Sequence, residues 1–142
     1  MQIVVIDNNI KAVRDALPKA IEKALEAIGL QCEGYAQLNC PVDTGLLRNS
    51  ITHAVSGKSA SISGYRADKP NKDGEYESGT YTGTMGASGG ATVYIGTNVE
   101  YAPYVEFGEY NHKVGRSHYL EHAVADHTDE YKQIAEEMLK DA

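Results

Sequence analysis

Three short segments combine residue types that could do chemistry. Asp43-Thr44-Gly45 is the tripeptide that carries the catalytic aspartate in aspartic proteases. The segment His118-Tyr119-Leu120-Glu121-His122 matches the inverted zinc-protease motif, in which two histidines one helical turn apart bind the metal. The glycine-rich stretch 83–90 could cradle a phosphate with its backbone N–H groups.

Each of these interpretations lacks a sequence feature that the chemistry needs. The tripeptide of aspartic proteases follows an apolar strand, whereas here a helical pattern and Pro41 precede it. A catalytic zinc needs a third protein ligand, and His112 and His127 are the nearest candidates. Stretch 83–90 has no Gly-Lys-Ser/Thr ending and leads into a strand pattern. We therefore predict a chain that is not an enzyme and holds no metal or cofactor; the alternative function is a zinc-dependent hydrolase using the two histidines of the motif.

Charge and cysteine content narrow the classes of function further. The chain has 13 Lys and Arg against 20 Asp and Glu, a net charge of −7, and residues 121–142 alone hold seven acidic and two basic residues. This balance argues against tight nucleic-acid binding and against docking on an anionic membrane. The apolar run 3–6 is too short for a signal peptide or a membrane span. Cys32 and Cys40 would lie about 12 Å apart along one helix, so we expect reduced thiols.

Hydrophobic periodicity predicts a long helix near each end of the chain. The first follows a β-branched strand at 2–6, contains Pro18 as a kink or a restart, and ends at Pro41. The last begins near Ser117 and carries an acidic outer face. Two long helices that bracket a β-rich centre indicate the α+β class.

The centre of the chain alternates in hydrophobicity at three places. Residues 51–55 and 60–65 predict a β-hairpin, and 91–96 predict a further strand. The 25 residues 66–90 hold six glycines and predict a long mobile loop. We therefore expect a single domain over residues 1–142, with a small antiparallel sheet of about four strands packed against both long helices.

Two blocks of sequence resemble those of a family of small tailed-phage proteins. Residues 40–51 (Cys-Pro-Val-Asp-Thr-Gly-Leu-Leu-Arg-Asn-Ser-Ile) are similar to a block P-V-D-T-G-x-L-R-x-S-I of that family. About fifty residues later, 96–108 are similar to a block G-T-x-x-x-Y-A-x-Y-V-E-F-G. At 116–120 the family has Pro and Phe where this chain has Ser and His or Tyr. The family comprises minor tail, neck and tail-completion proteins, encoded between the portal and major tail protein genes of long-tailed phages and prophages.

The resemblance implies a structural, non-enzymatic subunit of a head–tail connection or tail-completion assembly. It implies a homo-oligomeric ring, formed during virion morphogenesis, whose partners are copies of itself and other neck or tail proteins. The protein would be made in the bacterial host cytoplasm and end in the neck or tail of the virion. Residues of the two blocks that we take as a structural motif are Asp43, Thr44, Gly45, Leu47, Arg48, Tyr101, Tyr104, Glu106, Phe107 and Gly108.

Elementary packing arguments assign these motif residues roles in the fold. Residues 42–50 are expected to form a turn that leads into a short helix with Asp43 as its N-cap, and Leu47 is expected in the core. Pro103 and Gly108 predict a two-turn helix between them, with Tyr104 and Phe107 packed onto the sheet. Arg48 is the expected ion-pair partner of Glu106.

Overall fold

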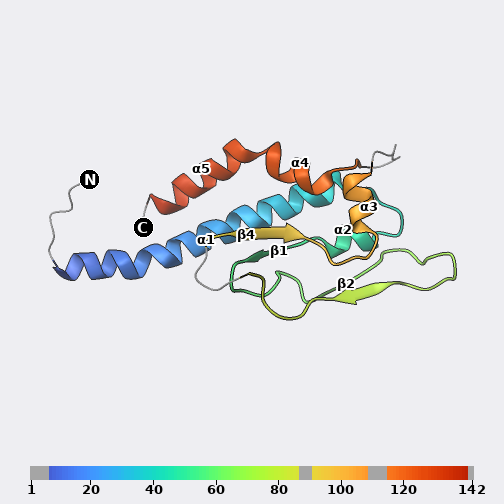
Figure 1. Cartoon of the computed structure of the whole chain (residues 1–142), viewed down its shortest axis with the longest axis horizontal. Helices are drawn as coiled ribbons and strands as arrows, with labels where there is room; N and C mark the ends of the chain where they lie inside the picture. The colour runs from blue at the N-terminus through green and yellow to red at the C-terminus, as the bar shows by residue number, and fades with distance from the viewer. Residues whose placement is uncertain (1–6, 87–90, 109–114, 141–142) are drawn as a thin grey trace.

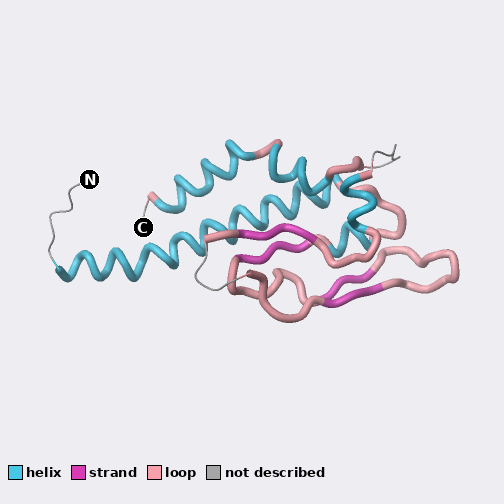
Figure 2. Tube along the Cα trace, viewed as in Figure 1, coloured by secondary structure: helices cyan, strands magenta, loops and turns pink. Residues whose placement is uncertain are grey.

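The computed structural model describes residues 7–86, 91–108 and 115–140, with side chains given from residue 18 onward. Helix α1 runs along the molecule, with α4 and α5 on one side and strands β1 and β4 on the other (Figures 1 and 2). The elements are α1 (Asp7–Asn39), α2 (Leu46–Ser50), β1 (Thr52–Val55), β2 (Gly64–Arg66), β3 (Ser78–Thr80), β4 (Val93–Gly96), α3 (Ala102–Phe107), α4 (Tyr119–Ala125) and α5 (Thr128–Leu139). The strand predicted at 2–6 lies outside the described residues.

Helix α1 forms the middle layer because two of its faces are buried. It is continuous over 33 residues and Pro18 lies inside it, so the restart considered for this position does not occur. Cys32, Ala36 and Cys40 recur every four residues and are buried. Their small side chains let α4 and α5 pack closely along one face, and the other face receives β1 and β4. The sheet therefore contacts the C-terminal helices through α1.

The C-terminal helical pattern, predicted as one helix, is divided into α4 and α5. The break lies at Asp126 and His127, between the end of α4 and the start of α5. The hydroxyl of Tyr131 on α5 donates a hydrogen bond to the carbonyl of Ala123 on α4. Asp126 accepts a charged hydrogen bond of 2.9 Å from Arg116. These contacts satisfy polar groups at the break and set the bend, which a periodic pattern on both sides does not reveal.

The strands pair differently from the prediction. β1 pairs antiparallel with β4, Thr52 opposite Gly96, and β2 pairs antiparallel with β3, Gly64 opposite Thr80. The predicted hairpin of 51–55 with 60–65 is therefore wrong, and two separate two-stranded sheets replace the expected sheet of about four strands. The α+β class is confirmed. Alternation locates a strand, but a strand buried along its whole length, as β1 is, gives no indication of its partner.

The segment 66–90, predicted as a loop, contains β3 and a structured hairpin. Ala67 is buried, and its N–H donates to the carbonyl of Glu77 at 2.9 Å. The side-chain oxygen of Asn71 accepts hydrogen bonds from the N–H groups of Asp73 and Glu75, which closes the tip. Local side-chain-to-backbone bonds therefore order a stretch that has almost no aliphatic residues. The mobility expected of 66–90 stays a prediction.

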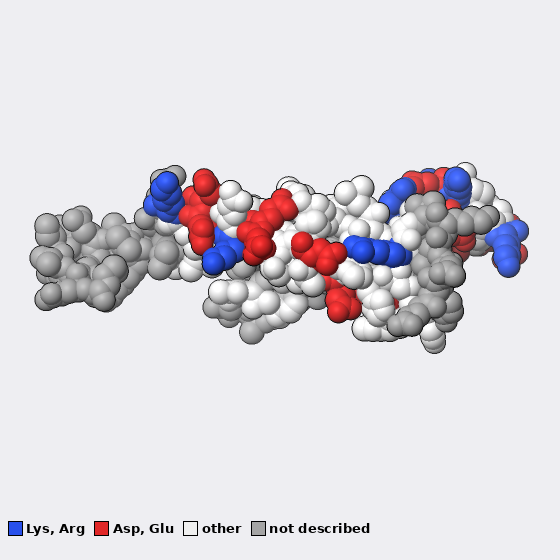
Figure 3. Space-filling model, turned by 90° about the horizontal axis from the view of Figure 1, so that it is seen from above, with Lys and Arg blue, Asp and Glu red and all other residues white. Residues whose placement is uncertain are grey.

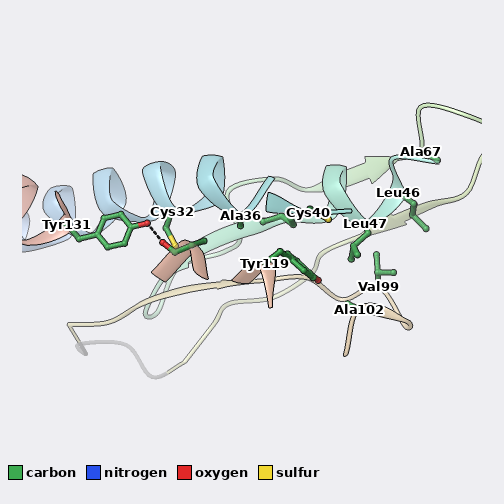
Figure 4. Close-up of a cluster of buried hydrophobic side chains, with 12 residues drawn as sticks. Cys32, Ala36, Cys40, Leu46, Leu47, Ala67, Val99, Ala102, Tyr119 and Tyr131 are labelled. Atoms are coloured by element: carbon green, nitrogen blue, oxygen red, sulfur yellow. Dashed lines mark hydrogen bonds between the residues drawn. The ribbon is translucent and has the colours of Figure 1, made fainter. Parts of the chain in front are cut away.

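The core lies where α1, α2 and α4 meet (Figure 4). Leu47 is buried in it, which confirms its predicted place, and Ile51 is buried there too. Tyr119 from the start of α4 is fully buried against them. The buried members of the core are Cys32, Ala36, Cys40, Leu46, Leu47, Ile51, Ala67, Val99, Ala102, Tyr119, Ala123 and Tyr131.

Candidate functional site

The first motif block forms the turn between α1 and α2. Gly45 occupies the N-cap position of α2 with φ +88°, a left-handed conformation that favours glycine. The N–H of Leu46 donates to the hydroxyl of Thr44 at 3.3 Å. Asp43 is exposed and makes no cap hydrogen bond, so its predicted role as the N-cap is wrong. Thr44 and Gly45 start the helix instead: the hydroxyl of Thr44 accepts the hydrogen bond, and Gly45 provides the left-handed backbone conformation.

Replacing Gly45 with alanine should lower the free energy of unfolding by about 1–2 kcal/mol, because a side chain is disfavoured at this φ. The new Cβ would also lie 2.6 Å from Oδ2 of Asp68 and displace that side chain. Urea unfolding followed by circular dichroism measures the loss. Gly34→Ala is the matched control. Gly34 lies inside α1, a Cβ added there has no neighbouring atom within 4 Å, and alanine should preserve or raise stability. Equal stability of the two variants would contradict this account of Gly45.

The same block holds the base of the β2–β3 hairpin. The carbonyl of Thr44 accepts hydrogen bonds from the N–H groups of Asp68 at 2.8 Å and Lys69 at 3.0 Å. Asn49 donates from its side chain to the carbonyl of Arg66 at 2.8 Å and to Oδ1 of Asp68 at 3.0 Å. Three residues that are distant from the motif in sequence, Arg66, Asp68 and Lys69, are thus fixed to it.

Arg48 completes this anchor by forming an ion pair with Asp68. The expected pair of Arg48 with Glu106 is therefore wrong. Both members of the observed pair are partly exposed, so its contribution to stability is small, about 0–1 kcal/mol.

Glu106, the charged residue of the second block, joins α3 to the start of α4. Its side chain is only 6% exposed, although aromatic residues on either side of it face solvent. Oε1 accepts hydrogen bonds from the N–H groups of Leu120 at 2.6 Å and Glu121 at 3.2 Å. These N–H groups belong to the first turn of α4, where helical donors have no intrahelical partner. Glu106 is therefore an N-cap supplied from another helix, and His118 at the cap position supplies none.

Helix α3 turns its polar residue inward and its aromatic residues outward. Ala102 and Glu106, four residues apart, face the interior. Tyr104 and Phe107 are 72% and 74% exposed, so the prediction that they pack onto the sheet is wrong. The helix itself is confirmed: it ends at Gly108, whose N–H donates to the carbonyl of Tyr104 at 3.0 Å. Tyr101, at the N-cap position of α3, is also exposed.

The two histidines of the zinc-protease pattern each contact a carboxylate of their own helix or its end. Nδ1 of His118 lies 3.3 Å from Glu121, and Nδ1 of His122 lies 3.4 Å from Asp126. His127 stacks flat on Tyr35 with 3.5 Å between the ring centres. Within the described ranges, no three His, Cys, Asp or Glu side chains are arranged to hold a metal ion. His112 lies outside those ranges.

A cluster of charged and polar side chains around the buried His53 joins α1 to β1, and sequence analysis missed it. His53 is only 2% exposed. Its Nε2 lies 2.6 Å from Glu26 and its Nδ1 lies 3.2 Å from Glu33. The hydroxyl of Ser61 donates to the same oxygen of Glu33 at 2.7 Å. Gly29 leaves room for the imidazole, since a Cβ there would lie 2.6 Å from the ring.

The contacts of this cluster shift two titrations. The hydrogen bond to Glu33 raises the pKa of His53 against the opposing effect of burial, and Glu26 raises it further. Burial alone would raise the pKa of Glu33, but hydrogen bonds from His53 and Ser61 outweigh burial and lower it. Glu26 and Glu33 lie seven residues apart, two turns along one face of the helix, and this spacing is the signal that could have located the cluster.

The two cysteines are free and buried, which agrees with the predicted reduced thiols. Burial raises the pKa of Cys32, and it raises the pKa of Cys40 to about 12. Thiols with so little thiolate are weak nucleophiles. In the described residues, the two motif blocks make packing contacts in the core and cap the starts of α2 and α4. The aromatic side chains of α3 lie on the surface.

In this arrangement the motif residues organise the fold and part of its outer surface. In a comparison with protein-family models, residues 5–108 match the HK97-gp10-like family, described as "Bacteriophage HK97-gp10, putative tail-component". The chain belongs to this family, and the resemblance to tailed-phage proteins is thereby confirmed. Searches of curated proteins and of solved structures found no match. Among the described helices, none has the length and apolar character needed to cross a membrane.

Proposed function

We propose that the chain is a non-enzymatic subunit of a head–tail connection or tail-completion assembly, and that it forms a homo-oligomeric ring. It would be made in the host cytoplasm and reside in the neck or tail of the virion. Its partners would be copies of itself and other neck or tail proteins. Membership of the phage tail-component family supports the class of protein. The exposed aromatic pair on α3 is the observation that carries the assembly role.

Tyr104 and Phe107 are held in an exposed position by the buried face of their own helix. Large aromatic side chains are enriched in protein–protein interfaces, where they supply much of the binding energy. Leu30 and Leu38 on α1 form a second exposed apolar pair, eight residues apart on one face. A closed ring needs two different surfaces that meet head to tail, and two such pairs on different elements suit that geometry.

Acidic surface charge suits a ring through which DNA passes. Figure 3 looks onto the side of α4 and α5, where acidic groups lie among a few basic ones. The described C-terminal acidic residues are Glu121, Asp126, Asp129, Glu130, Glu136 and Glu137. Phosphates are repelled by such a surface, so a genome that slides past it is not held.

We expect the double substitution of Tyr104 and Phe107 by serine to leave the fold intact and to prevent assembly. Phage particles made with this variant should accumulate as separate heads and tails in electron micrographs, as should particles made without the protein. Val124→Ser is the matched control, because Val124 is an exposed apolar residue on α4 outside the motif. Joined particles formed without the protein would contradict the proposed function, and normal assembly by the serine variant would contradict the role of the aromatic pair.

A further inference from the structure

Among the residues that the structure describes, no strand pairs with the outer edge of β4 in the β1–β4 sheet. Ser56 donates from its N–H to the carbonyl of Thr92 at 2.8 Å, which makes these two residues a hydrogen-bonded pair. In the antiparallel register, Ala54 with Tyr94 is then the next hydrogen-bonded pair, and the backbone groups alternate in direction. The N–H and C=O groups of Val93 and Ile95 therefore point away from β1.

The opposite edge of the sheet confirms this alternation. On β1, His53 also points away from its partner strand, and its carbonyl accepts a hydrogen bond from the N–H of Ser61 at 2.8 Å. Segment 59–62 thus covers part of the β1 edge. For Val93 and Ile95, the part of the chain that the structure describes supplies no such partner.

The β4 edge also lacks the features that usually prevent strand addition. Residues 91–97 (Ala-Thr-Val-Tyr-Ile-Gly-Thr) contain neither a charged residue nor proline. Lysine and proline are the residues that commonly prevent natural edge strands from pairing with another strand. An edge without such residues, whose backbone donors and acceptors point outward, can bind an added strand by main-chain hydrogen bonding.

The sequence directly before α1 has the composition of a β-strand. Residues 2–6 (Gln-Ile-Val-Val-Ile) are uncharged and β-branched at four of five positions. Residues 2–6 cannot reach strand β4 of the same chain. Gly29 lies against Val93, since a Cβ on Gly29 would be 2.7 Å from the Val93 side chain. Asp7 is 22 residues away along α1, about 33 Å of helix, whereas five extended residues span at most about 18 Å.

We propose that residues 2–6 of one subunit pair with the β4 edge of a neighbouring copy of this chain. The inference rests on the proposed ring and names how adjacent subunits are joined. The donor segment precedes α1 in the chain and β4 is the acceptor, and Figure 1 shows the start of α1 well separated from β4 along the molecule. A donor and an acceptor at different places make the contact head to tail, which propagates around a ring.

Cysteine pairing between two differently marked chains tests the contact. One chain carries Ile3→Cys, Val4→Cys or Val5→Cys, and the other, larger by a fused tag, carries Tyr94→Cys on the exposed face of β4. Oxidation of the mixture should give a disulfide-linked heterodimer on a non-reducing gel for at least one register. A chain with Tyr76→Cys, exposed on the β2–β3 hairpin, is the control. No heterodimer above this control would overturn the proposal.

Deletion of residues 2–6 supplies an independent readout. Size-exclusion chromatography with light scattering should show loss of the oligomer, while the helical circular dichroism signal is kept. Val4→Pro should act like the deletion and Val4→Thr like the wild type. If the deleted chain still oligomerises and still joins heads to tails, strand pairing fails and the proposed function stands. If the cross-link forms but particles join without the protein, the proposed function fails and the pairing stands.

Discussion

Replacing His53 with leucine is expected to lower the free energy of unfolding by about 3–5 kcal/mol, the range for removing one partner of a buried ion pair. Glu33 would stay largely buried with only the Ser61 hydroxyl bound to it. Urea unfolding near pH 6 measures the loss. Glu26→Gln is the matched control: Glu26 is mostly exposed, so its removal should cost less than about 1 kcal/mol. Similar losses from both substitutions would contradict the buried character of the His53–Glu33 pair.

The same cluster predicts a pH window of greatest stability. The pKa of His53 is raised from 6.5 in the folded protein, so its contribution is complete below pH 6.5 and is lost as the pH rises through the folded pKa. The pKa of Glu33 is lowered from 4.5, so its contribution is present above pH 4.5 and is lost as the pH falls through the folded pKa. The cluster therefore stabilises most between pH 4.5 and 6.5. Thermal unfolding midpoints should fall from pH 6.5 to 9 in the wild type and stay flatter in His53→Gln.

Glu106→Ala is expected to cost about 2–3 kcal/mol of unfolding free energy, because hydrogen bonds to a charged group are strong and α4 would lose its cap. Glu106→Gln should cost about half as much. Its amide oxygen can replace Oε1 as the acceptor, but a hydrogen bond to a neutral acceptor is weaker than one to a charged acceptor. Hydrogen exchange gives the site-specific readout: the amides of Leu120 and Glu121 should exchange faster in the alanine variant. Glu121→Gln is the control, because its side chain is exposed. Unchanged exchange at these two amides would refute the capping role.

Local patterns in the sequence were sufficient for most of the helices and for the position of two strands. The β-rich centre between long helices, the two-turn helix before Gly108 and the strand at 93–96 all follow from periodicity and from glycine and proline punctuation. Strand pairing was not predictable, because β1 is buried throughout and offers no polar face to indicate its register. The bend between α4 and α5 depends on a tertiary contact of Tyr131 and was equally invisible.

The residues of the two motif blocks were identified from the sequence, but their partners and the cluster around His53 were not. Hydrophobicity favours turning Tyr104 and Phe107 inward and Glu106 outward, and the structure reverses this arrangement. The reversal arises because the unpaired N–H groups of α4 lie beneath α3 and need an acceptor. Arg48 finds Asp68 rather than Glu106 because the β2–β3 hairpin, which no local pattern predicted, returns to the motif turn.

The buried thiols have a consequence for a particle that leaves the cell. Phage particles are built in a reducing cytoplasm and then persist in oxygenated surroundings. Oxidation of cysteine begins with the thiolate, and burial keeps Cys32 and Cys40 protonated and shielded from solvent oxidants. Neither thiol can reach the other across two turns of α1, so no internal bridge distorts the helix on storage. Burial thus protects both thiols against a change from a reducing to an oxidising environment.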